Sequence, residues 1–369
     1  MSLVETLGSS IGVRTAGSPE AALAAEAIAD AFRAAGLDPH FQEFPLLGYD
    51  AEEPELEIDG ERWPAGPCMY AHPTDGVVEG RVRHVGTSKP DGLFPPAHSF
   101  AVVDDTGREL AHLEMSPFGG DAIPFSSSAR QIVVPPTAFI SGPDANRLLE
   151  LEGATARVRI SGHFVPGRTE RNVIARLDGE SDEAIVVSAH YDSVWRGPGA
   201  IDNATGVEGV RRLAERFAAG PPPARSIEFC AFAAEEIGLL GARVFVLEAQ
   251  LRGQLARIRG VVNLDCIAHG QRLSVLASPP ELLGRAEGLA RSLGLTERYE
   301  TEFSTTARGV DSVPFAEADV PAATILHFPY PEYHTTRERS ALVDEQRLAD
   351  AVELAAALVE SQLDRPVTQ

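Results

Sequence analysis

The sequence has few cysteines and no long hydrophobic run. Cys68, Cys230 and Cys266 are odd in number and widely spaced, which excludes a disulfide framework and a cysteine-rich metal cluster. No uncharged apolar segment approaches the ~18 residues that a membrane span needs. The amino-terminal residues also lack the basic start and apolar core of a signal peptide. We therefore expect a cytoplasmic protein with no membrane partner.

Positive charge is also scarce. The 369 residues carry 32 Lys and Arg against 54 Asp and Glu, a formal net charge of −22, and Lys89 is the only lysine. A polyanion would be repelled by this surplus, so neither nucleic acid nor an anionic membrane surface is an expected partner. The chain is 44% hydrophobic and 23% charged, which is enough apolar material for a substantial core and excludes global disorder.

The composition divides the chain into two kinds of segment. A helix is predicted at Pro19–Ala35, because Ser18 suits its cap and Gly36 suits the position after its end. Residues 46–163 instead contain short β-type runs that alternate with Pro- and Gly-rich stretches. We predict that residues 1–45 and 164–369 form one domain and that residues 46–163 form a mostly-β domain inserted into it.

Beyond Arg171, predicted strands alternate with predicted helices. Continuous apolar runs indicate buried strands at Ala184–Ser188, Ser226–Ala233, Ile258–Leu264, Leu273–Ala277 and Ala323–His327. Helical patterns occur at Thr205–Phe217, Leu239–Gln250 and Asp344–Leu363. This alternation predicts an α/β fold with a mostly parallel central sheet flanked by helices.

Residues with metal-binding and acid–base chemistry follow the predicted strands. Ligands bind at the carboxyl ends of strands in such sheets, so these groups should meet at one edge. They are His190, Asp192, Asp202, Glu235, Glu236, Asp265 and His334. Taken singly, each would be an ordinary surface pair, cap or turn residue. Their joint placement after strands of one sheet indicates a site.

Imidazoles and carboxylates without thiolates suit zinc better than copper, and manganese or cobalt are possible substitutes. One catalytic zinc takes three protein ligands and keeps an open position. The larger set here fits two metal ions that share a bridging carboxylate, which are typically ~3.5–4 Å apart. The sequence therefore predicts a two-metal centre.

The motifs resemble those of metallopeptidase family 28, the co-catalytic zinc aminopeptidases and their relatives. The matching segments are Ala189–Ser193, Gly199–Gly206, Glu235–Gly241, Asn263–Asp265, Tyr333–Thr335 and the opening Gly12–Ser18. The middle of the chain resembles a protease-associated insert more weakly. One departure is Val310–Phe315, where relatives often carry Ser-Asp-His before the Pro-Phe pair.

The resemblance implies a zinc-peptidase (phosphorylase/hydrolase-like) fold and assigns the ligands. One zinc would be held by His190, Asp202 and Asp265, and the second by Asp202, Glu236 and His334, so that Asp202 is the bridge.

The resemblance also assigns roles beyond the ligands. Asp192 would accept a hydrogen bond from the His190 ring and fix its tautomer. Glu235 would be the general base, and Tyr333 would donate a hydrogen bond to the developing oxyanion. In relatives the peptide bond that corresponds to Asp202–Asn203 is commonly cis.

The implied activity is metal-dependent hydrolysis of peptide or amide bonds, with N-terminal residues of peptides as the first expectation. Trp195, Arg196, Phe328 and Tyr330 are candidates for a substrate pocket, or they merely pack the loops, with surface ion pairing the safer expectation for Arg196. The alternatives are a carboxypeptidase or small-molecule amidase, a glutaminyl cyclase with one zinc, and a non-catalytic relative. Glutaminyl cyclases usually have Asp-Ser where this chain has Asp202-Asn203. The sequence indicates no oligomeric state.

Overall fold

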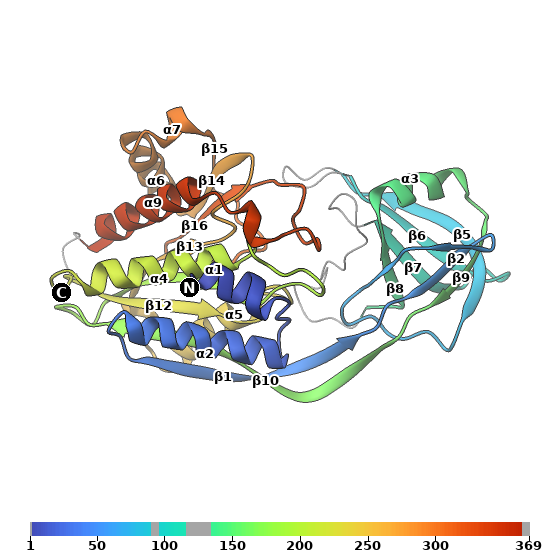
Figure 1. Ribbon diagram of the computed structural model, residues 1–369, viewed down its shortest axis with the longest axis horizontal. Helices are drawn as coiled ribbons and strands as arrows, with labels where there is room; N and C mark the ends of the chain where they lie inside the picture. Colours follow the sequence, from blue (N-terminus) through green and yellow to red (C-terminus); the bar gives the residue numbers. More distant parts are fainter. Residues whose placement is uncertain (1, 90–95, 116–133, 364–369) are drawn as a thin grey trace.

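The strands form two sheets of eight, one in each of two parts of the molecule (Figure 1). The computed structural model describes residues 2–89, 96–115 and 134–363. The order of the first sheet is β1 (Pro39–Ala51), β10 (Gly162–Leu177), β12 (Ser226–Phe232), β11 (Ala184–His190), β13 (Ile258–Leu264), β16 (Ala322–Phe328), β14 (Arg272–Ser278) and β15 (Glu300–Ser304). The five strands predicted after Arg171 are all present, within two residues of their expected ends.

The centre of the first sheet is parallel. β11 pairs in parallel with β12 and β13, and β13 pairs in parallel with β16. These four strands therefore end at the same edge. β10 joins this group antiparallel, and β14 runs antiparallel to β16. The predicted α/β fold is confirmed, although nothing in the apolar run of β14 indicates its direction, because a strand buried on both faces reads alike either way.

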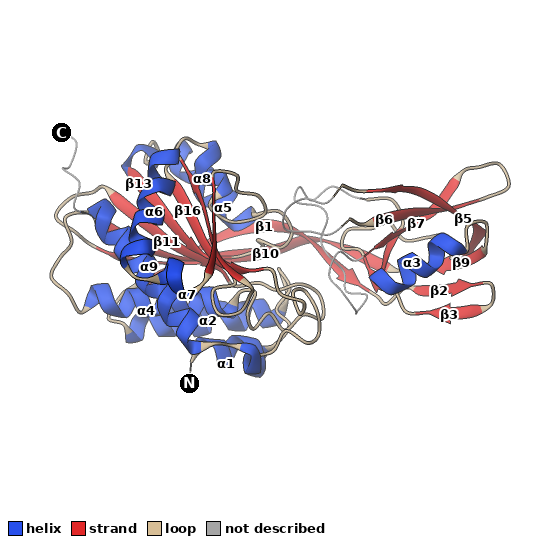
Figure 2. Ribbon diagram, turned by 90° about the horizontal axis from the view of Figure 1, so that it is seen from above, coloured by secondary structure: helices blue, strands red, loops and turns tan. Residues whose placement is uncertain are grey.

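Helices cover both faces of this sheet (Figure 2). The helices α2 (Pro19–Ala34), α4 (Ala204–Ala218) and α9 (Glu345–Leu363) pack on one face, whereas α5 (Leu240–Leu251) and α8 (Val313–Glu317) pack on the other. Side chains alternate accordingly: Ile185 and Val187 belong to the first core, and Val186 belongs to the second. Shorter or peripheral helices are α1 (Leu3–Glu5), η1 (Thr6–Ile11), η2 (Leu255–Arg257), α6 (Pro280–Ser292), α7 (Leu295–Arg298) and η3 (Ser340–Leu342).

The second sheet is the mostly-β part. Its order is β3 (Glu61–Trp63), β2 (Glu55–Ile58), β9 (Thr155–Arg159), β5 (Val78–Thr87), β6 (His98–Val103), β7 (Glu109–Met115), β8 (Thr137–Ile140) and β4 (Gly66–Pro67), and α3 (Gly142–Glu150) packs against it. All of its strand pairs are antiparallel except β7 with β8. It has a separate apolar core, centred on Phe100, Leu113 and Val158.

A two-stranded ribbon joins the two parts. β1 and β10 pair antiparallel from Pro39 opposite Ala175 to Ala51 opposite Gly162, and run from the first sheet toward the second (Figure 1). The predicted boundaries at residues 45/46 and 163/164 fall inside these strands, and the division into domains stays a prediction. Where the ribbon reaches the second part, the ring of Tyr49 lies 5.5 Å from Tyr70 and 5.2 Å from Phe164.

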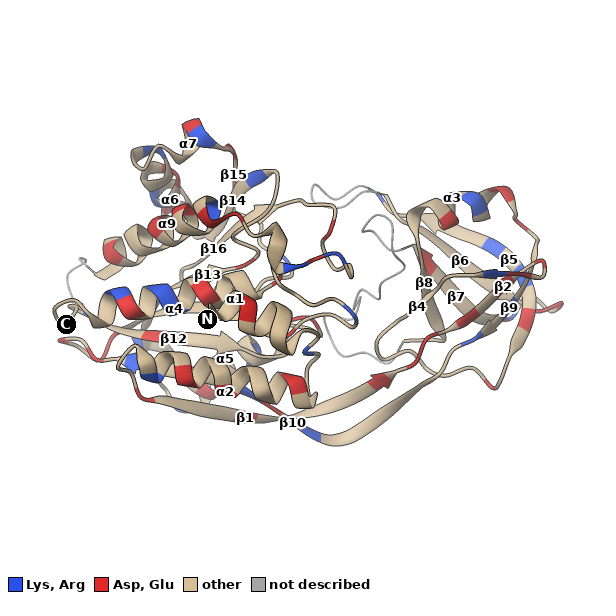
Figure 3. Ribbon diagram, in the orientation of Figure 1, with Lys and Arg blue, Asp and Glu red and all other residues tan. Residues whose placement is uncertain are grey.

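The general features read from the composition also have structural counterparts. Cys68, Cys230 and Cys266 are all buried. Figure 3 shows Lys and Arg positions scattered among Asp and Glu positions over both parts of the molecule. Within residues 2–89, 96–115 and 134–363, no helix combines the length and the apolar character that crossing a membrane requires.

Candidate metal centre

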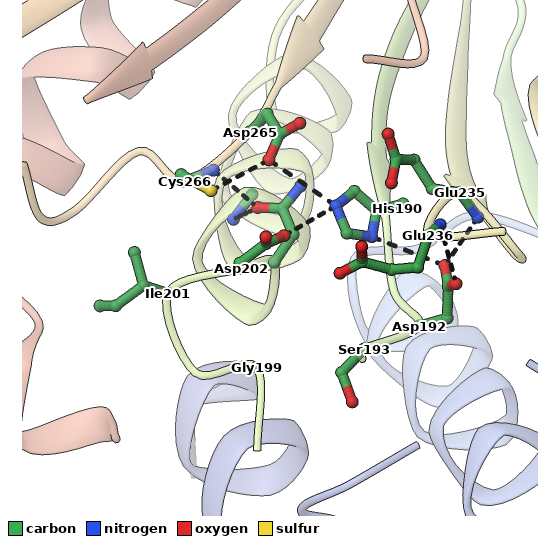
Figure 4. A network of polar contacts seen from close by, with 12 residues as sticks. His190, Asp192, Ser193, Gly199, Ile201, Asp202, Glu235, Glu236, Asp265 and Cys266 are labelled. Carbon is green, nitrogen blue, oxygen red and sulfur yellow. Dashed lines mark hydrogen bonds and ion pairs between the residues drawn. The ribbon is translucent and has the colours of Figure 1, made fainter. Parts of the chain in front are cut away.

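The carboxyl ends of the parallel strands bring the predicted ligands together. His190 is the last residue of β11, and Asp265 directly follows β13. The Nε2 atom of His190 lies 2.9 Å from Asp202 Oδ1 and 3.7 Å from Asp265 Oδ1. Asp202 and Asp265 lie on one side of the His190 ring, and Glu235 and Glu236 lie on the other (Figure 4).

His334 approaches Asp202 from the loop after β16. Its Nε2 atom lies 3.1 Å from Asp202 Oδ2 and 3.3 Å from Glu236 Oε2. The ligand atoms of His190, Asp202 and Asp265 lie within 4.8 Å of one another, and so do those of Asp202, Glu236 and His334. A third group of this kind contains His190, Glu235 and Glu236. Asp202 thus belongs to two of the three groups, with one oxygen directed to each imidazole.

The donor set fits metal ions. The five side chains are buried or nearly so, and together they carry three carboxylates and two imidazoles. Glu236 Oε1 is buried and has no hydrogen-bond partner among the described residues. A buried carboxylate oxygen without a donor is costly unless a cation faces it. Neutral imidazoles and ionised carboxylates are the ligand forms that zinc requires.

The carboxylates strongly perturb the titration of the two histidines. Burial lowers the pKa of His334, but Glu236 and Asp202 outweigh burial and raise that pKa to about 10. Burial likewise opposes a charge on His190, yet Glu235, Asp192 and Asp202 raise its pKa well above the usual range. Without another cation, the cluster recruits protons onto its imidazoles. Perturbed groups of this kind concentrate at functional sites.

Glu235 lies beside the ligands, after β12. Its side chain is 8% exposed. Burial raises its pKa well above the usual range; the His190 charge opposes this effect, and Glu236 adds to it. A carboxylate with a raised pKa is a better proton acceptor near neutral pH than an exposed one.

Asp192 holds the turn that carries the two glutamates. Its Oδ1 atom accepts a hydrogen bond of 3.0 Å from the Glu235 backbone N–H, and its Oδ2 atom accepts one of 3.3 Å from that of Glu236. The expected hydrogen bond from the His190 ring is instead a 3.5 Å ion-pair contact between Nδ1 and Oδ1. The sequence did not indicate that Asp192 binds the turn with Glu235 and Glu236, because the hydrogen-bond donors in that turn are main-chain N–H groups, which every residue type carries.

The aromatic candidates occupy two sides of the centre. The Tyr333 ring stacks on the His334 imidazole with centroids 3.9 Å apart, and Phe328 and Tyr330 pack edge-on against Tyr333. Trp195 instead lines a cavity of about 20 Å³ beside Glu236. That cavity is also lined by Met69 and Tyr70 from the inserted segment and by Ile237.

Arg196 points to the inserted segment rather than into the cluster. Its Nη1 atom lies 2.7 Å from Glu53 Oε1, with half of the side chain exposed. Its guanidinium also lies 5.3 Å from the Trp195 ring centroid. The surface ion pairing that the sequence favoured for this residue is therefore present.

Several backbone conformations at the centre are unusual. Ala234, Cys266 and His334 have φ angles of 58°, 51° and 56°, in the left-handed region that non-glycine residues rarely adopt. Each is a ligand or directly precedes or follows a site residue. Gly199 (φ 58°) has no room for a Cβ atom, because such an atom would lie 2.4 Å from the Asp202 carbonyl oxygen. The Asp202–Asn203 peptide bond is cis, as the resemblance implied.

Three buried charged residues near the centre were not singled out for a role by sequence reasoning. Glu338 and Arg14 contact the main chain of the loops that carry the ligands. Asp311 is fully buried, and both its oxygens lack hydrogen-bond partners among the described residues. Burial raises the pKa of Asp311 to about 8, opposed by His190 and reinforced by Asp265. The only feature of the sequence that pointed to Asp311 was its place in Val310–Phe315, the segment that differs from the usual pattern of relatives.

Arg14 supports the loop before Asp202 through hydrogen bonds to main-chain carbonyl groups of that loop. Its side chain is fully buried and donates to the carbonyl oxygens of Pro198 at 2.6 Å and Gly199 at 2.7 Å. It also donates to the carbonyls of Leu7, Gly12 and Tyr191. Burial lowers its pKa, opposed by Asp192 and Glu338, to about 10, so the guanidinium remains charged at neutral pH. This accounts for the arginine in the opening Gly12–Ser18 motif.

Replacing Arg14 with methionine should lower the free energy of unfolding by about 3 kcal/mol, because several buried carbonyls lose their charged donor. The measurement is urea unfolding of both proteins in the same buffer. Arg33→Met is the control: this arginine is half exposed in a surface pair with Asp30, so a loss below about 1 kcal/mol is expected. Equal losses in the two variants would contradict the role given to Arg14.

Comparisons with known proteins identify the family of this chain. The sequence profile of Peptidase family M28 matches residues 172–359, more than half of the chain. This chain belongs to peptidase family M28. Aminopeptidase YwaD of Bacillus subtilis is 27% identical over 236 residues, which cover 61% of this chain and 50% of that protein. The chain spans about half the length of the curated relatives it matches first.

The similarity to solved structures covers nearly the whole chain. A zinc aminopeptidase from Bacillus subtilis superposes with a TM-score of 0.75 at 21% identity, covering 97% of this chain and 93% of that one. A glutaminyl cyclase from an Acidobacteriales bacterium superposes less well, with a TM-score of 0.58 at 17% identity, covering 99% and 94%. At these identities the likeness concerns the fold, including the inserted β-rich part.

Proposed function

We propose that this M28 chain is a two-zinc aminopeptidase that removes N-terminal residues from peptides. The observation that supports this most strongly is the shared carboxylate: Asp202 belongs to two of the three three-residue groups and directs one oxygen to each imidazole. His190 and Asp265 would complete the first zinc site, and Glu236 and His334 the second. Manganese or cobalt would be substitutes in vitro.

Glu235 is the proposed general base. When bound, two zinc ions polarise the scissile carbonyl and lower the pKa of the attacking water. Glu235 lies within 4.8 Å of ligand atoms of His190 and Glu236, one from each proposed zinc site, and belongs to neither of the two groups that share Asp202. Its buried carboxylate, with its raised pKa, takes the proton of the water and passes it to the leaving amine.

Tyr333 is the proposed donor to the oxyanion. Burial, reinforced by Asp202 and Glu236, raises the pKa of its hydroxyl well above the usual range, so the hydroxyl keeps its proton. Its ring is fixed by stacking on His334. A preorganised donor of this kind stabilises charge that develops on the substrate carbonyl oxygen.

The proposed substrate is a peptide with a free amino terminus. Glu235 and Asp265 would hold the ammonium group by charge, in a centre whose side chains are mostly acidic. Trp195, Phe328 and Tyr330 would contact substrate side chains. The chain would act on small amides by the same chemistry, and it would need neither nucleic acid nor a membrane as partner.

The aminopeptidase assignment predicts a requirement for a free amine. Aminoacyl 4-nitroanilides should be hydrolysed about 10²-fold or more faster than their N-acetylated forms, because the blocked substrate leaves the acidic groups unpaired. Dialysis against a chelator should remove the activity and added zinc should restore it. The measurement is kcat/KM for each substrate, with C-terminally blocked dipeptides included.

Other results would favour the alternatives. Faster turnover of N-acetylated dipeptides with a free carboxylate would indicate a carboxypeptidase. Cyclisation of N-terminal glutamine without hydrolysis would indicate a glutaminyl cyclase, whose fold is similar. Absence of turnover in the zinc-loaded protein would indicate a non-catalytic relative.

A further inference from the structure

Glu338 contacts the main chain of two metal-ligand residues at once. It is 1% exposed and lies four residues after His334. Its Oε1 atom accepts hydrogen bonds from the backbone N–H groups of Ile201, at 3.1 Å, and Asp202. Its Oε2 atom accepts a 3.1 Å hydrogen bond from the backbone N–H of His334. One buried carboxylate thus joins two loops that are far apart in the sequence.

These two loops need such a support more than the other ligand positions do. His190 ends β11, where it pairs with Phe232 of β12, and Asp265 directly follows β13 and donates its backbone N–H to the Ile325 carbonyl at 3.0 Å, so main-chain hydrogen bonds to neighbouring strands fix both backbones. The backbone of Glu236 is held by Asp192. Asp202 and His334 lie outside the strands, and His334 has a left-handed φ of 56°. Such a conformation persists only where its surroundings enforce it.

We infer that Glu338 is a positioning residue that sets the separation of Asp202 and His334, and that it supports the zinc site of Asp202, Glu236 and His334 more than the other site. This inference rests on the two-zinc function proposed above. His190 and Asp265 keep their strand-fixed positions without Glu338. The second site instead takes two of its three ligands from loops that Glu338 joins.

The hydrogen-bond pattern requires a carboxylate rather than an amide. Two oxygens serve three N–H donors, and both sides of the carboxylate act as acceptors. Glutamine has the same shape but offers one oxygen. Its NH₂ group would face either the His334 N–H or the Ile201 and Asp202 N–H groups, leaving a buried donor without an acceptor. Glu338→Gln therefore breaks the hydrogen-bonded connection between the two loops while the volume of the side chain hardly changes.

The test is zinc binding by the full chain, measured by calorimetric titration of metal-free protein in competition with a chelator of known affinity. In Glu338→Gln, one of the two zinc ions should dissociate about 10–100-fold more readily than in the unaltered protein, the range found when an outer hydrogen-bond partner of a ligand is lost. The other zinc should change by less than threefold. Circular dichroism of each metal-free protein checks the fold.

Glu208→Gln is the matched control. Glu208 is also 1% exposed and accepts hydrogen bonds from the backbone N–H of Leu3, at 3.1 Å, and from the guanidinium groups of Arg211 and Arg212, none of which is a proposed ligand. It should keep both zinc affinities. Glu338→Asp retains both acceptors with a shorter reach and replaces the glutamine variant if that variant does not fold. It too should weaken one zinc more than the other.

Each outcome has a distinct meaning. A folded Glu338→Gln protein with two unchanged zinc affinities would overturn the positioning role, and so would equal weakening of both sites. If the unaltered protein binds only one zinc, the failure lies in the two-zinc function rather than in Glu338.

Discussion

Replacing Glu235 with glutamine is expected to lower kcat by about 10²–10⁴-fold, the usual contribution of a general base. The protein should keep its zinc, because neither of the two proposed zinc sites uses Glu235, whose carboxylate lies within 4.8 Å of ligand atoms of His190 and Glu236 as a neighbour. The amide cannot accept the proton of the attacking water at neutral pH, whereas its volume matches that of the carboxylate. The measurement is kcat with an aminoacyl 4-nitroanilide, together with metal analysis of the same sample.

Two further variants separate this effect from a general effect of removing a negative charge. Glu236→Gln, at the next position, should lose zinc as well as activity, because its carboxylate is a proposed ligand. Glu317→Gln, on the surface of α8 in an ion pair with Arg243, should leave kcat within twofold of the unaltered protein. A Glu235→Gln enzyme that retains more than a tenth of the activity would contradict the assignment of the base.

Replacing Asp202 with asparagine is expected to weaken both zinc sites by more than about 100-fold, beyond the loss of an outer-sphere partner, because one side chain serves both ions. Asp265→Asn should weaken one site only. The expected pattern is therefore two zinc ions lost with the bridging residue and one lost with the terminal ligand. Equilibrium dialysis against buffered zinc measures both.

A different pattern would contradict the bridging role. If Asp202→Asn retains one zinc with unchanged affinity, then Asp202 serves a single ion and the two groups do not share a ligand. The metal-free proteins provide the control for folding. Asp202 contacts both imidazoles, and asparagine retains the shape needed to fill that space.

The strands and the grouping of the proposed ligands could be predicted from the sequence because their signals are local. Apolar runs such as Ala184–His190 mark buried strands, and the polar residues that follow them converge because parallel strands end at one edge. The general location of Asp202 and His334 followed from the same rule and from motifs. The antiparallel direction of β14 was not predicted, since burial on both faces removes the alternation that would otherwise orient a strand.

The supporting residues could not be assigned in this way. Arg14 and Glu338 act on backbone carbonyl and N–H groups of distant loops, and main-chain partners leave no pattern of residue types in a sequence. The same holds for Asp192, whose strongest contacts are with the backbone of the glutamate turn. The left-handed conformations of Ala234 and Cys266 also arise from tertiary packing, because neither residue type favours them.

The number of zinc ions bound per chain tests the central claim most directly. Full-length protein, stripped of metal and titrated with zinc in the presence of a competing chelator, should bind two equivalents, with activity toward an aminoacyl 4-nitroanilide reaching its maximum only as the second is bound. Saturation at one equivalent, with full activity at that point, would contradict the two-zinc centre built around Asp202.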